Sequence, residues 1–144
     1  MTYPQINKES VVNNSIKKFF VDNVAVAEGV YVVFDRTMSP PTQDDVSKWL
    51  YVEMYDYAPG HLNRKMVYIY CFTKNDLEGV DLSNLVDVVM KYLHEGQMPI
   101  YDDDLITVIG GALLTVDPIS RMFTTKDRAK ARYIPITLTW GGVW

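Results

Sequence analysis

The sequence predicts an α+β domain in which a mostly antiparallel sheet carries two amphipathic helices packed on one face. Three observations lead to this fold class. The expected strands come in runs instead of alternating with helices, two stretches repeat apolar residues at helical spacing, and two neighbouring strands alternate between aromatic and aliphatic residues. At 144 residues, the chain is expected to form a single domain, 1–144, with its own core.

The first helix is expected over residues 8–21, with Asn7 as a suitable N-cap. A strand follows over residues 29–34. Residues 35–46 contain two prolines and three acids, so they are expected to form a long exposed loop. The apolar residues of the helix fall at i, i+4, i+7 and i+8 on one side: Val12, Ile16, Phe19 and Phe20.

The next two strands, residues 49–57 and 65–73, are joined by a turn at residues 58–60. Because successive strand residues point to opposite faces, the pair has two different faces. One is aliphatic, with Leu50, Val52, Met54, Val67, Ile69 and Cys71. The other is mainly aromatic, with Trp49, Tyr51, Glu53, Tyr55, Tyr57, Met66, Tyr68, Tyr70 and Phe72.

Helices can cover the aliphatic face, but the aromatic face is large for a chain of this size to cover alone. Tyrosine suits an interface because its ring buries apolar area while its hydroxyl keeps a polar partner. We therefore expect the aromatic face to be an interface. Its residues should be partly covered by another subunit or by the last strand: Tyr51, Tyr55, Tyr68 and Tyr70.

The second helix is expected to begin after Asp81, which can cap it, and to end before Gly96. Lys91 and His94 lie in its last turn, where positive charge complements the helix dipole. Its apolar residues repeat at helical spacing: Leu82, Leu85, Val86, Val89, Met90 and Leu93.

Three adjacent acids, Asp102–Asp104, precede a strand expected over residues 105–109, whose continuation Gly110 and Gly111 loosen. The acids could hold a divalent cation, but metal loops space their ligands and use glycine to turn, and this run does neither. A solvated turn or an acidic interface is the preferred interpretation.

The connection 117–131 is polar and mixed in charge, and the chain ends on a strand expected over residues 133–140. Pro135 cannot donate a ladder hydrogen bond, so this strand is predicted to be an edge strand or bonded on one side only.

The composition excludes several classes. A net charge of −4 argues against a generic nucleic-acid binder, and one cysteine excludes an internal disulfide framework and fits a reducing cytoplasm. The polar first seven residues do not read as a signal peptide, and the nearly uncharged run 105–116 is too short to span a bilayer. We therefore expect a protein that is neither exported nor embedded in a membrane.

No catalytic motif is present. His61 and His94 fall in a loop and in a last helical turn, and Cys71 lies on the aliphatic face, where a buried thiol is inert packing. We expect neither enzymatic activity nor a cofactor or metal.

A basic stretch within 117–132 has two interpretations. It is either a solvated loop or a contact for an acidic neighbouring surface, such as the loop with Asp44 and Asp45 or the Asp102–Asp104 run of an adjacent subunit. Under the second interpretation it orders on assembly, and a head-to-tail contact of this kind can close into a ring. The basic residues are Arg121, Lys126, Arg128, Lys130 and Arg132.

The order of these elements resembles the tail-terminator proteins (tail-completion or neck proteins) of long-tailed bacteriophages. The resemblance rests on the pattern of residues 12–20, 30–34, 49–55, 67–72, 82–93 and 134–140, since that family has no diagnostic short motif. The long 117–131 segment departs from the smallest members and leaves the position in tail or neck open.

The resemblance implies a structural subunit that forms a ring, usually of six copies, which caps the tail tube and joins it to the head-side connector. Its partners would be further copies of itself, the tail tube or sheath and the connector, with genomic DNA passing through the ring without sequence-specific recognition. It would be made in the host cytoplasm and end in the virion. The alternatives are another tail or tail-like subunit, such as a tube or baseplate component, and a small non-catalytic protein-binding module.

Overall fold

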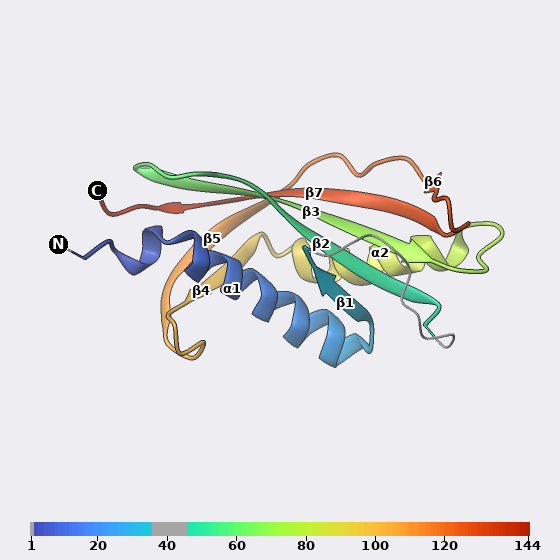
Figure 1. The fold of residues 1–144 in the computed structure, drawn as a ribbon, viewed down its shortest axis with the longest axis horizontal. Helices are drawn as coiled ribbons and strands as arrows, with labels where there is room; N and C mark the ends of the chain where they lie inside the picture. The colour runs from blue at the N-terminus through green and yellow to red at the C-terminus, as the bar shows by residue number, and fades with distance from the viewer. Residues whose placement is uncertain (1, 36–45) are drawn as a thin grey trace.

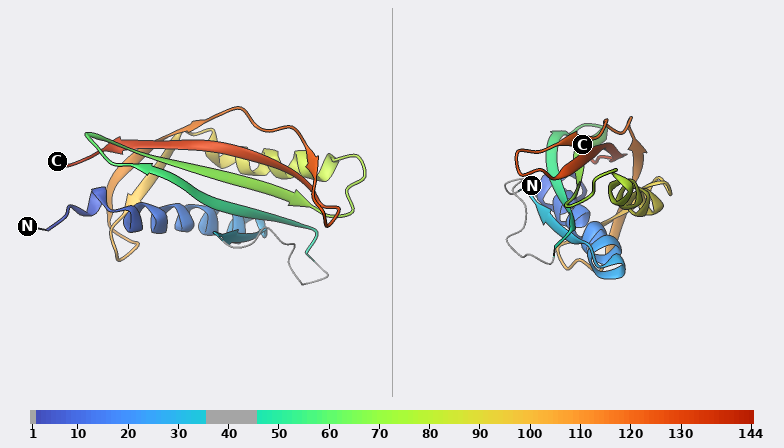
Figure 2. Two further views of the ribbon diagram at one scale, coloured as in Figure 1. Left: turned by 45° about the horizontal axis from the view of Figure 1, so that its top comes forward. Right: turned by 90° about the vertical axis from the view of Figure 1, so that its right-hand side faces the viewer.

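The computed structural model describes residues 2–35 and 46–144 and shows seven strands in one curled sheet with two helices on its inner side (Figures 1 and 2). The sheet order is β1-β2-β3-β7-β5-β4, and a short β6 pairs with β7. All pairings are antiparallel except β1 with β2. The predicted fold class is therefore confirmed, with one parallel pair added. The strands are β1 (Tyr31–Phe34), β2 (Lys48–Ala58), β3 (Leu62–Thr73), β4 (Gln97–Tyr101), β5 (Val108–Val116), β6 (Phe123–Thr124) and β7 (Lys130–Gly141).

The first helix, α1 (Glu9–Phe20), continues as a π-helical segment, Val21–Val26. Asn7 does not cap it, which corrects the prediction. Lys8 occupies the cap position, while the buried Asn7 side chain accepts hydrogen bonds from Asn63 Nδ2 and from the Val143 N–H, each at 3.0 Å. Local spacing had assigned the Asn7 side chain to the helix cap, but it forms long-range hydrogen bonds instead.

The second helix, α2 (Val80–Leu93), is capped from outside its first turn. Asp81 was the expected cap, but Asp76 performs this role: its carboxylate accepts the N–H groups of Leu82 at 2.9 Å and Asp81 at 3.2 Å. Burial alone would raise the pKa of Asp76, yet the hydrogen bonds from Leu82, Thr73 and Asp81 hold it below its ordinary value.

Pro135 had led to the prediction that the last strand is an edge strand or bonded on one side only, but β7 lies between β3 and β5 and pairs with both. Asp117 donates its N–H to the Pro135 carbonyl, so the backbone of Pro135 faces the side on which β5 lies. The β5 ladder has ended one residue earlier, at Val116 opposite Ile136. The missing N–H therefore falls where no ladder bond is required.

The region between α2 and β7 differs most from the prediction. β4 was not expected, and the strand predicted over 105–109 begins at Val108 and runs through both glycines. Residues 102–107 instead form the β4–β5 turn, with Leu105 at φ +57°. A Cβ at Gly110 would lie 2.8 Å from Cδ1 of Ile6, so a side chain there would require the end of the Ile6 side chain to move.

The core lies between the inner face of the sheet and the two helices, as predicted. It joins Ile16 and Phe20 of α1, Leu85 and Val89 of α2, and the aliphatic residues of the sheet in one cluster. None of the described helices is long and apolar enough to cross a bilayer. The buried sheet residues of this cluster include Leu50, Val52, Val67, Ile69, Cys71, Ile134, Ile136 and Leu138.

Candidate functional site

The outer face of the sheet, on the side away from both helices, carries a row of stacked aromatic rings. The stack runs across β2, β3 and β7: Tyr55 lies 4.9 Å from Tyr68, and Tyr68 lies 5.7 Å from Tyr133, both with ring planes within 11°. Tyr70 continues from Tyr133 at 5.5 Å and contacts Phe72 at 6.2 Å. We call these five residues the aromatic row.

Strand alternation explains the row, because Tyr55, Tyr68 and Tyr133 occupy outward positions of neighbouring strands. The register places Tyr68 beside Glu53 on one side and beside Pro135 on the other. Tyr133 was not among the predicted interface residues. Covering of the aromatic face by the last strand was one of two alternatives in the prediction, but the residue of that strand that would complete the row was not identified.

The four predicted interface tyrosines differ in exposure. Tyr51 is buried and lies 5.7 Å from Tyr70, whereas Tyr68 and Tyr70 are half-buried beside Tyr133 of the last strand. Tyr55 is 47% exposed at the open end of the row. Burial raises the pKa of Tyr51 and of Tyr70, which keeps both hydroxyls protonated as hydrogen-bond donors.

Tyr57 was predicted on the aromatic face but lies on the inner side. A register shift in β2 between Met54 and Tyr57 reverses its direction, and its ring stacks on Trp140 at 5.9 Å. Its hydroxyl donates to the Asn7 carbonyl, and burial raises the pKa of Tyr57 to about 12. The sequence pattern has period two throughout this strand and so does not show the shift.

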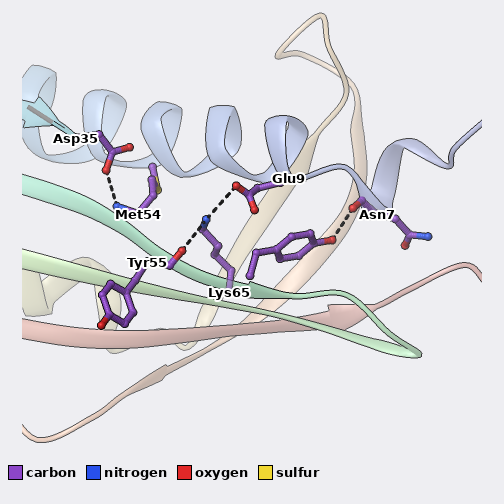
Figure 3. A network of polar contacts seen from close by, with 7 residues as sticks. Asn7, Glu9, Asp35, Met54, Tyr55 and Lys65 are labelled. Carbon is purple, nitrogen blue, oxygen red and sulfur yellow. Dashed lines mark hydrogen bonds and ion pairs between the residues drawn. The ribbon is translucent and has the colours of Figure 1, made fainter.

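Lys65 lies opposite Tyr57 next to this register shift, and its side chain points toward Glu9 and the Tyr55 carbonyl (Figure 3). Its side chain is buried, and Nζ donates to the Tyr55 carbonyl at 3.3 Å and lies 3.9 Å from the Glu9 carboxylate. Burial lowers the pKa of Lys65, partly offset by Glu9. Next to Tyr55 on the same strand, the Met54 N–H donates to the Asp35 carboxylate at 2.8 Å. These contacts fix the end of β2 from which Tyr55 projects outward.

A cleft lies beside the aromatic row, between the sheet and the β6 segment. Its volume is about 550 Å³. We call it the aromatic cleft; it is lined by Tyr70, Phe72, Phe123, Thr125, Lys126, Asp127 and Tyr133.

Of the predicted basic residues only Lys126 lines this cleft, and the others differ in their contacts. Lys130 donates to the Leu77 carbonyl, and Arg132 Nε donates to the Ser120 carbonyl at 2.9 Å. Arg121, Lys126 and Arg128 are exposed and form no ion pair within the described residues. The segment is held on β7 within the subunit, through bonds such as Ser120 N–H to the Tyr133 carbonyl at 3.0 Å. Asp44 and Asp45, the other half of the predicted charge pairing, lie outside the described residues.

The acidic run forms a hydrogen-bonded turn, residues 102–107, which we call the acidic turn. The Asp104 carboxylate accepts the N–H groups of Ile106 and Thr107, each at 2.8 Å. Gln5 donates to Asp102 at 2.9 Å and to Asp103 at 2.8 Å. These bonds lower the pKa of Asp102 and of Asp104, so both stay charged. In the described part of the chain, these acids included, no three or more His, Cys, Asp or Glu side chains are arranged so that they could hold a metal ion.

The residues considered for nucleophilic chemistry lie in the core and on loops. Cys71 is fully buried in the aliphatic cluster, and burial raises the pKa of its thiol to about 12. His61 is exposed beside the β2–β3 turn. His94 Nδ1 lies 2.8 Å from the Lys91 carbonyl at the end of α2. The Cys71 thiol is thus protonated at neutral pH and packed as an apolar group.

Comparisons with known proteins give a fold but no family. No protein-family model and no curated protein sequence matches this chain. Fifteen chains of solved structures are similar in fold. One of them matches with a TM-score of 0.56 and 13% identity, over 92% of this chain and 96% of the other, and its name describes no function. At this identity the likeness concerns the fold alone.

Proposed function

We propose that this chain is a ring-forming structural subunit of a phage tail, a terminator that caps the tail tube and joins it to the head-side connector. Its partners are further copies of itself, the tail tube or sheath and the connector. The protein acts without catalysis and takes its place in the virion. The element order that resembles the tail-terminator family is the basis for naming the tail.

The observation that carries an assembly function is the outer face of the sheet. Both helices pack on the inner face, so the aromatic row is covered within the subunit only in part. Tyr55 is exposed at one end of the row, Tyr68, Tyr70 and Tyr133 are half-buried, and the exposed Phe123 lies beside the row, 6.5 Å from Tyr133. Aromatic residues at this density are typical of the centre of protein interfaces.

The geometry of the row favours a protein partner over a nucleic acid or a sugar. Bases and sugars bind aromatic residues through the ring faces. In the row the faces of Tyr55, Tyr68 and Tyr133 are turned toward one another, which leaves mainly ring edges and hydroxyls for a partner. The net charge of −4 also opposes phosphate binding.

A second candidate is a small non-catalytic protein-binding module, and the aromatic cleft is the observation that favours it. A module of that kind would bind its ligand as a monomer. A third, another tail or tail-like subunit of the tube or baseplate, would build stacks or larger assemblies. The three are separated by how many copies associate and whether association stops.

The test is the mass of the purified chain in solution by light scattering across a concentration series, with negative-stain images of any assembled fraction. The proposed function predicts one closed ring whose mass stays constant above a threshold concentration. Stacks that grow with concentration would favour a tube protein, and a monomer at every concentration would favour the binding module.

A further inference from the structure

The acidic turn is an acidic projection with an apolar tip. Its hydrogen bonds give it a defined shape, and Asp102 also donates its N–H to the Thr107 carbonyl at 2.8 Å. Ile106 is 80% exposed at this turn, and Val108 beside it is also exposed. The Asp103 and Asp104 carboxylates and these apolar side chains are exposed together, with the half-buried Asp102 beside them.

The aromatic cleft has the complementary character. Its walls are the rings of Tyr70, Phe72, Phe123 and Tyr133, and Lys126 lies on its lining. Arg121 and Arg128 are exposed in the same segment. The segment therefore carries three exposed cations, and the cleft lining has one carboxylate, Asp127.

The two features lie at opposite ends of the long axis of the subunit. Figure 1 shows the β4–β5 turn near the end that holds both termini, and β6 near the other end; Figure 2 shows the same separation from another side. One chain therefore cannot bring its own acidic turn into its own aromatic cleft. The complementary surfaces can meet only between two copies.

We propose that the acidic turn of one copy docks in the aromatic cleft of the next, with Ile106 among the rings and the carboxylates facing Lys126 and Arg128. This contact is heterologous, so repetition gives a ring if the rotation closes and an open chain if it does not. The inference rests on the proposed function as an assembly protein and names the contact that builds it. Complementary charge sets the register, and the apolar insertion supplies the affinity.

The experiment uses two variants that each block one half of the contact. Ile106→Lys removes the apolar tip and leaves the cleft intact, whereas Phe123→Glu with Lys126→Glu alters the cleft and leaves the acidic turn intact. Each alone should self-associate roughly 30-fold more weakly, the loss typical of an interface anchor. Val26→Lys, at an apolar side chain that is 74% exposed elsewhere, is the matched control and should assemble like the parent.

Mixing the two blocked variants is the decisive measurement. One intact turn and one intact cleft remain, so native mass spectrometry should find a 1:1 dimer that grows no further and weakens with added salt. Circular dichroism and thermal unfolding of each variant check that it is folded. If a variant fails that check, Ile106→Ala and Lys126→Ala replace the pair, with smaller losses expected in the same direction.

The outcomes separate this inference from the proposed function. Rings formed equally by the parent and by both variants would overturn the inference and leave the ring function standing. If the parent forms open chains and the variants stop their growth, the inference is supported and the proposed closed ring is excluded. A parent that is monomeric at all concentrations overturns both.

Discussion

Ser15 Oγ on α1 accepts the backbone N–H of Tyr101 at 2.9 Å, so the first helix closes the free edge of β4. Pro99 directs its backbone to the same side as Tyr101 and has no N–H to offer. One potential donor on this edge is therefore occupied and a second is missing. An edge protected in this way does not add a strand from another molecule.

Replacing Ser15 with Ala should lower the free energy of unfolding by about 1–3 kcal/mol, because the Tyr101 N–H loses its partner inside the protein. Urea denaturation measures the change. The control is Ser83→Ala on the exposed side of α2, where the change should stay within about 0.5 kcal/mol. Equal effects at the two serines would show that the Ser15 hydrogen bond does not stabilise the edge.

The aromatic row gives a prediction that separates assembly from folding. Tyr55→Asp should weaken self-association, because a charge would replace an exposed ring in the interface, while the unfolding temperature of the subunit changes little. Tyr31→Asp is the control, since Tyr31 is 42% exposed on β1, outside the row. Light scattering of both variants beside the parent tests this, and loss of assembly by the Tyr31 variant alone would contradict it. Tyr70→Asp is less suitable because Tyr70 is half-buried against Tyr133 and contributes to the subunit itself.

The core predicts a large cost for Leu85→Ala. Leu85 is buried in the cluster that joins α2 to the sheet, so its truncation should reduce the free energy of unfolding by roughly 2–5 kcal/mol. Leu77→Ala provides the comparison, at a side chain that is 92% exposed, with an expected change below about 0.5 kcal/mol. Denaturant titration of the two variants decides whether this side of α2 is the buried one.

Tyr57 predicts how stability responds to alkaline pH. Its pKa is raised from 10.0 to about 12 in the folded protein, so above pH 10 the unfolded chain loses a proton that the folded chain keeps. The contribution of Tyr57 to the free energy of unfolding is therefore fully present below pH 10 and is lost as the pH rises toward 12. The stability difference between the parent and Tyr57→Phe should shrink over that interval.

Several other groups titrate in the same range, among them Tyr51 and Tyr70, whose raised pKa values act in the same direction as that of Tyr57. The comparison with Tyr57→Phe is therefore necessary. The raised pKa of Cys71 also removes stability as the pH rises above 9, whereas the lowered pKa of Lys65 adds stability as the pH approaches 10.5. All these contributions are common to the parent and the variant, so they cancel in the difference. A difference that stays constant from pH 9 to 11.5 would count against a buried, neutral Tyr57.

The sequence predicted those parts of the fold in which local periodicity and burial agree. Leu85 and Val89 repeat at helical spacing and are buried, and Val67 and Ile69 alternate with the outward tyrosines of β3. The prediction failed where one residue serves a distant partner. Asn7 bonds Asn63 and Val143, Asp76 caps a helix that Asp81 was expected to cap, and Gly110 makes room for Ile6.

The candidate site was predictable only in outline. Alternation identified the outward tyrosines of β2 and β3, but the row is completed by Tyr133 of β7, whose place depends on strand order. The aromatic cleft depends on Phe123, in a β6 strand of two residues that carries no periodic signal. Tyr57 was misplaced because a single register shift reverses every side chain that follows it.

The place of β7 between β3 and β5 also governs when the subunit can fold during its synthesis. A nascent chain that has not yet received residues 130–141 has both of those strands without the neighbour that joins them, and Tyr133 is absent from the aromatic row. The sheet is therefore completed only when β7 has been made, after the other strands and both helices. Because Tyr133 belongs to both the aromatic row and the lining of the aromatic cleft, these two surfaces are completed when β7 pairs with β3, and assembly through them requires that pairing first.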